Sequence, residues 1–76
     1  MEGTIRERLT NTFAPIELNV VTVDAQSGSY DVKVVSKTFD NVPLRERHQM
    51  INKLFEEELL SGTIHSLTIS AKPANK

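Results

Sequence analysis

The sequence predicts an α+β fold: a two-layer αββαβ sandwich in which two helices cover one face of a three-stranded mixed sheet. Apolar residues recur at helical spacing in residues 5–13 and 43–61, and β-branched and other apolar residues concentrate in residues 17–24, 30–36 and 64–71. The apolar residues are too few to line both faces of a sheet, so both helices should lie on the same side. Because a helix joins the second strand to the third, these two strands are expected to be parallel.

The N-terminal half predicts a short helix followed by a β-hairpin. Thr4 and Glu7 have the spacing of a capping box, which places the start of the helix near residue 5, and Pro15 closes it. The two strands that follow are joined by AQSGS, residues 25–29, a turn composition of ordinary hairpin-loop length. We therefore expect consecutive antiparallel strands here.

The longest predicted element is one amphipathic helix. Its core-facing stripe consists of Leu44, His48, Ile51, Phe55 and Leu59, with Leu54 at the edge. Pro43 suits the first turn, and Asp40 or Asn41 is the expected cap. Gly62 should end the helix, because the residue after a helix often needs a positive φ.

Length and composition limit the function classes. The 76 residues make a single domain, 1–76, with residues 1–3 and 72–76 expected to fray. No apolar run approaches the about 20 residues that span a bilayer, so no membrane role is expected. The chain has no cysteine, which excludes disulfides, a thiolate nucleophile and an all-cysteine metal site. No signal or transit peptide is visible, which favours the cytoplasm, also the nucleus in a eukaryote, or mitochondria if a presequence was trimmed.

The chemistry-bearing residues are few. No nucleophile-elbow, zincin, P-loop or dinucleotide-binding pattern occurs, so we do not expect an enzyme. His48 lies in the apolar stripe, which favours a packed, structural imidazole. His65 opens the third strand on its core-side face, at the end nearest Gly62, where a ring could pack and still offer one nitrogen outward. Its position alone leaves a structural role and a ligand role open.

The charges of the long helix oppose its macrodipole. Arg45 and Arg47 lie in the first turns, whereas acidic residues 56–58 lie in the last. Such a departure can mark a surface kept for a partner, although a solvated face is the simpler explanation. With Lys53, the two arginines form a weak basic patch on a chain whose net charge is -1.

Several stretches of the sequence resemble the BolA-like proteins. FDNVPLRERHQMIN, LFEEEL and IHSLTI carry the resemblance, and IRERL and YDVKVVS resemble the family's first helix and second strand. Phe39, the pair Arg47 and His48, and the pair Ile64 and His65 have the spacing of the family pattern, and the match covers nearly the whole chain. The resemblance implies a type II KH-like αββαβ fold.

The resemblance also implies a function. BolA-like proteins are non-catalytic partners of monothiol CGFS glutaredoxins in iron-sulfur cluster binding, trafficking or iron regulation. A 2Fe-2S cluster is then held by the glutaredoxin cysteine, glutathione and BolA side chains, and no cofactor is bound by the BolA protein alone. The histidine of the family's IHAL-like motif is the ligand, here His65, and imidazole is an established iron ligand in such clusters. His48, Phe39 and Gly62 keep structural roles.

One departure affects this expectation. Many members place a second ligand, Cys or His, in the loop between the first two strands, and here that loop, residues 25–29, contains neither. Asp24, Ser27 and Ser29 are poor substitutes on such iron, so a cluster should be held more weakly or with different ligation. A metal-free heterodimer with the glutaredoxin is the corresponding alternative.

A different function class is a nucleic-acid-binding transcriptional regulator with a KH-like fold, since some bacterial family members are described as transcription regulators. DNA would then contact Arg45, Arg47 and Lys53, although the GxxG loop with which KH domains clamp a backbone is missing between the helices. A metal-free adaptor is a third hypothesis. An uncovered edge strand leaves the chain as a monomer or a weak homodimer.

Overall fold

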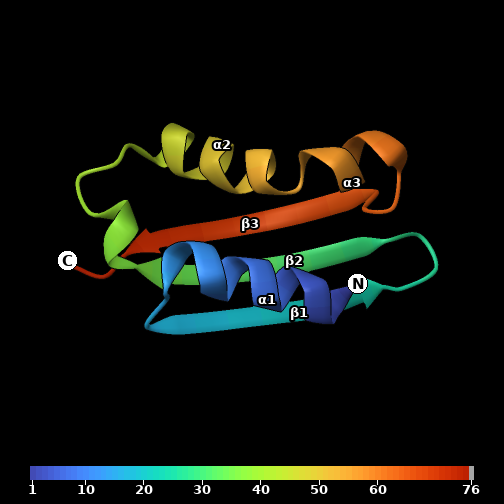
Figure 1. Cartoon of the computed structure of the whole chain (residues 1–76), viewed down its shortest axis with the longest axis horizontal. Helices are drawn as coiled ribbons and strands as arrows, with labels where there is room; N and C mark the ends of the chain where they lie inside the picture. Colours follow the sequence, from blue (N-terminus) through green and yellow to red (C-terminus); the bar gives the residue numbers. More distant parts are fainter. Residues whose placement is uncertain (76) are drawn as a thin grey trace.

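Two layers make up the structure: in Figure 1 one helix crosses in front of the lower two strands, and the other helical segments run along the upper strand. The computed structural model describes residues 1–75. Along the chain the elements are α1 (Glu2–Phe13), β1 (Glu17–Asp24), β2 (Ser29–Ser36), the 3-10 turn η1 (Lys37–Phe39), α2 (Leu44–Leu54), α3 (Glu56–Ser61) and β3 (Ser66–Pro73). The predicted α+β fold and the αββαβ order are confirmed, with the long helix divided in two.

The sheet has the order β1-β2-β3. β1 pairs with β2 antiparallel, with Val20 opposite Val32, and a bulge interrupts the pairing between Thr22 and Asp24. β2 pairs with β3 parallel, with Val32 opposite Ile69. The mixed sheet follows from the chain path, since a tight turn joins β1 to β2 and a helical crossover joins β2 to β3.

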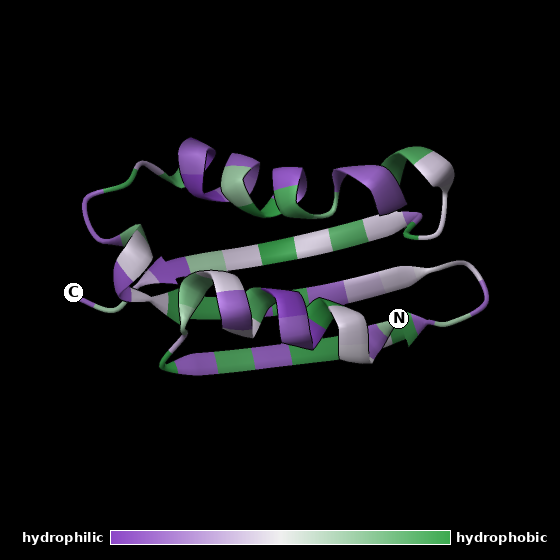
Figure 2. Cartoon of the chain, in the orientation of Figure 1, coloured by the Kyte–Doolittle hydropathy of each residue, from purple (hydrophilic) through white to green (hydrophobic). Residues whose placement is uncertain are grey.

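The core lies between the helices and one face of the sheet. Alternate residues of β2 are buried, namely Tyr30, Val32, Val34 and Ser36. Ile5, Leu9 and Phe13 of α1 and Ile51 of α2 complete this layer together with Phe39, Phe55 and Ile64. β1 alternates in hydropathy over its first part, as Figure 2 shows, whereas Val21 is apolar on the uncovered face and is 54% exposed. The sheet is therefore covered on one side, as expected.

The predicted single long helix is wrong, because it breaks at Phe55. This residue has φ −114° and ψ 21°, and it is fully buried between α2 and α3. The carbonyl of Leu54 would accept from the Glu58 N–H in a continuous helix; it accepts instead from the Arg8 guanidinium, at 3.3 Å. A side chain from α1 thus satisfies a backbone group that the break leaves free.

The break also corrects the expected conflict with the macrodipole. Glu56, Glu57 and Glu58 lie in the first turn of α3, and Lys53 lies in the last turn of α2. Acidic residues at a helix N-terminus and a basic residue at a C-terminus are favourable. The three glutamates therefore need no partner surface to explain them.

The helix starts differ from the predictions. α1 begins at Glu2 after Met1, with no capping hydrogen bond from a side chain, so the expected capping box at Thr4 does not form. Ala14 ends α1 with φ 44°. The backbone N–H of Ala14 donates to the Thr10 carbonyl at 3.0 Å.

The start of α2 also differs. Pro43 is the cap residue of α2, and neither Asp40 nor Asn41 caps it. The Asp40 carboxylate instead accepts from the backbone N–H of Asn75, at 3.1 Å. Leu44, expected in the core, is 56% exposed at this end. Gly62 ends α3 with φ 86°, as predicted.

The chain ends lie partly in regular structure. Residues 2 and 3 belong to α1, and residues 72 and 73 belong to β3, although residues 1–3 and 72–76 were expected to fray. Position 76 lies outside the described residues. No helix within residues 1–75 is long and apolar enough to cross a membrane.

Candidate functional site

Two turns meet at one end of the molecule: the β1–β2 turn, residues 25–28, and the α3–β3 turn, residues 62–65 (Figure 1). The backbone N–H of His65 donates to the Gly28 carbonyl at 2.8 Å, and the N–H of Ser66 approaches the same oxygen at 3.3 Å. Gly28 has φ 75°, and a Cβ there would lie 2.7 Å from the Thr63 carbonyl oxygen. Only glycine permits this approach, so the two turns are joined through Gly28.

His65 lies in this junction with its side chain exposed. It precedes β3 instead of opening it, so the expected place on the core-side face of the strand is wrong. The neighbouring Ile64 takes the buried position, at 0% exposure. The hydrogen bonds of His65 to residues 1–75 use its backbone, and both imidazole nitrogens are left to solvent or to a ligand.

His48 has a different environment. It lies on α2 and is half-buried, outside the set of fully buried core residues. Ile51 and Phe55, on the same stripe, are both at 0% exposure. Phe39 is also fully buried, with its ring centroid 4.9 Å from that of Phe13. The packed centre that we expected around His48 is therefore formed by its apolar neighbours.

The donor set of the junction is small. Within residues 1–75, no three His, Cys, Asp or Glu side chains come together as a metal-binding group. Asp24 Oδ1 accepts from the backbone N–H of Gln26 at 3.1 Å, and the hydroxyls of Ser27 and Ser29 are 3.0 Å apart. These side chains hold the turn itself. His65 therefore suits one position of a cluster shared with another molecule, and the residues present do not suit a cluster held by this chain alone.

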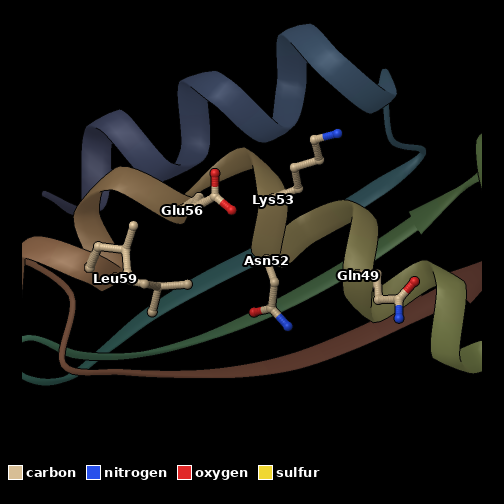
Figure 3. A pocket seen from close by; sticks show the side chains of 6 residues that line it. Gln49, Asn52, Lys53, Glu56 and Leu59 are labelled. Carbon is tan, nitrogen blue, oxygen red and sulfur yellow. The ribbon is translucent and has the colours of Figure 1, made fainter.

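The three cations expected to form a basic patch have different environments. Arg47 is half-buried, and its Nη1 donates to the Ala71 carbonyl of β3 at 2.8 Å. Arg45 and Lys53 are exposed. Lys53 lies beside an open depression on α2 and α3, where its side chain and that of Asn52 point in opposite directions (Figure 3). Arg47 is thus committed to β3, which leaves two of the three cations for a nucleic acid.

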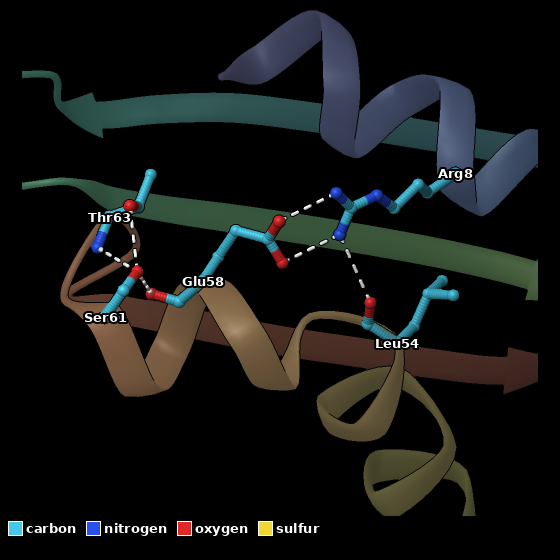
Figure 4. Close-up of polar contacts among 5 residues, drawn as sticks. All are labelled: Arg8, Leu54, Glu58, Ser61 and Thr63. Carbon is cyan, nitrogen blue, oxygen red and sulfur yellow. Dashed lines mark hydrogen bonds and ion pairs between the residues drawn. The ribbon is translucent and has the colours of Figure 1, made fainter.

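An ion pair that sequence reasoning missed joins α1 to α3 (Figure 4). Nη1 and Nη2 of Arg8 donate to Oε1 and Oε2 of Glu58, each at 2.7 Å. The guanidinium also lies 5.5 Å from the Phe55 ring centroid. The hydrogen bond from Arg8 holds the pKa of the Glu58 carboxyl below its usual range. The partners are 50 positions apart, so no local pattern could predict the pair.

Comparison with known proteins agrees with this architecture. The family model described as BolA-like protein matches residues 9–76. Protein BOLA2 of Arabidopsis thaliana is 39% identical over 66 residues, which cover 86% of this chain and 69% of that protein. The chain belongs to the BolA-like protein family, as the sequence resemblance predicted.

Solved structures show the same fold. BolA1 from Arabidopsis thaliana superposes with a TM-score of 0.88 at 33% identity, covering 99% of this chain and 93% of that one. The BolA domain of SufE1 from the same organism gives 0.85 at 35% identity, covering 95% and 90%. The helix break and the paired turns therefore occur in a chain with the BolA fold.

Proposed function

We propose that this protein is a non-catalytic partner of a monothiol CGFS glutaredoxin in iron-sulfur cluster binding, with His65 as its ligand to a shared 2Fe-2S cluster. The observation that supports this most directly is the exposed imidazole of His65, whose backbone is held by Gly28 while its ring nitrogens have no partner among the described residues. Membership of the BolA-like family supports the choice of partner.

The chemistry of the junction suits a shared site. A neutral imidazole is a good ligand for iron and replaces thiolate in some 2Fe-2S centres. A cluster of this kind has more ligand positions than His65 can fill, so the glutaredoxin cysteine and glutathione would supply others. The protein's own contribution is then to present one imidazole at a solvent-facing end of the sheet.

The β1–β2 turn limits this contribution. Its polar side chains are the Gln26 amide and the Ser27 hydroxyl, and the carboxylate of the preceding Asp24 accepts from the backbone N–H groups of the turn. We propose that this turn adds no strong second ligand. The complex should accordingly hold its cluster less tightly than one in which a histidine or cysteine occupies the turn.

The test reconstitutes the complex. The protein is mixed with a CGFS glutaredoxin, iron, sulfide and glutathione, and visible absorption and circular dichroism are recorded for wild type and for His65→Ala. We expect the wild type to change the spectrum of the glutaredoxin cluster, and His65→Ala to lose that change. An identical glutaredoxin spectrum with and without the wild-type protein contradicts the proposal.

The alternative is a nucleic-acid-binding regulator; because Arg47 donates to β3, only Arg45 and Lys53 of its three expected cations are exposed. A DNA-binding assay tests this alternative. Salt-dependent binding by the wild type that is lost in Arg45→Ala and in Lys53→Ala would replace the cluster proposal with the nucleic-acid one. For the cellular location, a complex that uses glutathione favours a reducing compartment such as the cytoplasm, and a chain without cysteine fits such a compartment as well as any other.

A further inference from the structure

Glu58 makes two contacts that connect distant parts of the chain (Figure 4). Its carboxylate forms the two-pronged pair with Arg8 of α1. Its backbone carbonyl accepts from the N–H of Ile64 at 3.0 Å, and the hydroxyl of Ser61 approaches the same oxygen at 3.3 Å. One residue of α3 therefore links α1 to the turn that carries His65.

The turn depends on these contacts for its position. The backbone of residues 64–65 is held at two points, by Glu58 through Ile64 and by Gly28 through His65. The imidazole has no hydrogen bond of its own to the described residues, so only the backbone directs it. A shift of α3 would move one of the two points and leave the other in place.

α3 cannot hold its own position. It has six residues, and an isolated helix of that length is unstable in water. None of its residues is fully buried; Leu59 packs partly against the core, and the pair with Arg8 is the second contact that anchors it. Arg8 also binds the Leu54 carbonyl at the end of α2 and thereby spans the break on both sides.

We propose that Arg8 is a positioning residue for His65, acting through Glu58 and Ile64 to hold the imidazole where a metal-bearing partner meets it. This inference rests on the proposed function. Second-layer residues that orient a metal ligand typically contribute about 10- to 100-fold to metal affinity. Arg8 is one residue further removed, and we expect an effect of about 10-fold, at the lower end of that range.

The test compares Arg8→Ala with a matched control. Lys33 forms a second ion pair within residues 1–75, with Glu17 at 2.8 Å, on the uncovered face of the sheet, so Lys33→Ala removes an ion pair away from the turn. Each variant is titrated with cluster-loaded glutaredoxin and followed by the His65-dependent circular dichroism signal. Arg8→Ala should need about 10-fold more partner, Lys33→Ala should match wild type, and Arg8→Lys should recover part of the loss.

A second measurement separates positioning from loss of folding. Amide hydrogen exchange in the free protein should speed up at Ile64 in Arg8→Ala, while Val32 in the central strand keeps its protection. If Arg8→Ala does not fold, Arg8→Lys takes its place in both experiments. Titration and exchange indistinguishable from those of Lys33→Ala would overturn the inference.

The two proposals fail in different ways. A wild-type protein with no His65-dependent signal contradicts the proposed function. Ile64 exchange that Arg8→Ala leaves unchanged contradicts the inference about Arg8, whatever the glutaredoxin experiment gives.

Discussion

The two histidines differ in what surrounds them. His48 lies on α2, half-buried beside the fully buried Ile51, whereas His65 lies in an exposed turn held by backbone contacts to Gly28. A helical residue takes its environment from the periodicity of its own segment. A turn residue takes its environment from the distant segments that meet it, here the β1–β2 turn and α3. The difference separates a half-buried position on a helix from an exposed position in a turn.

The largest expected effect comes from replacing each histidine by alanine. In the reconstituted glutaredoxin complex, His65→Ala should remove the whole histidine-dependent change of the visible spectrum, because its imidazole is the exposed one. His48→Ala should retain that change. Equal losses in both variants would show that neither ring acts as the ligand and that both variants disturb the fold.

The next effect tests the packing of α2 beside His48. Ile51→Ala should lower the free energy of unfolding by about 2–5 kcal/mol, because the removed side chain leaves a cavity in the core. Urea denaturation measures this. At urea concentrations well below the unfolding midpoint, the variant should still give the His65-dependent spectrum. A loss of less than about 1 kcal/mol in the free energy of unfolding would show that this side of α2 is loosely packed.

The difference in stability between two glycine variants is a smaller effect, and it tests how the His65 turn is held. Gly28→Ala and Gly62→Ala both place a side chain at positive φ, which costs about 1–2 kcal/mol. Only at Gly28 would the new Cβ meet the Thr63 carbonyl, adding about 1–3 kcal/mol, whereas nothing lies within 4 Å of a Cβ at Gly62. Thermal unfolding should therefore rank Gly28→Ala as the less stable variant. The reverse order would mean that the two turns are not in contact in solution.

The smallest effect is a dependence on acid. Hydrogen bonds from Arg8 and Lys33 lower the pKa of Glu58 and of Glu17 in the folded state. The unfolded chain thus takes up protons first as the pH falls, so both pairs stabilise the fold above the ordinary carboxyl pKa and this contribution disappears on acidification. Unfolding midpoints between about pH 6 and about pH 3 should fall, and fall less in Arg8→Ala than in wild type. An unchanged slope in Arg8→Ala would mean that the pair does not form in solution.

Much of the fold was predictable because its signals are local. β1 has the predicted bounds, residues 17–24, since alternation and the flanking turn residues are properties of that segment. Gly62 ends its helix because the need for a positive φ is local too.

The errors share a different cause. The helix break at Phe55 and the bound carbonyl of Leu54 depend on Arg8, which lies 46 positions away from Leu54 in the sequence. Three consecutive glutamates after Phe55 are themselves a helix-start signal, and that signal could have indicated α3. The exposure of His65 depends on where β3 begins. The Gly28 carbonyl fixes the backbone just before β3, because it accepts from the N–H of His65.

Local order and the family were therefore determined by the sequence itself, because periodicity, turn chemistry and motif spacing are carried by neighbouring residues. Tertiary structure alone decided that His65 faces outward, that Arg47 binds β3 and that Arg8 reaches Glu58. Each of these depends on contacts between segments that are far apart in the chain and that meet only when the two layers pack.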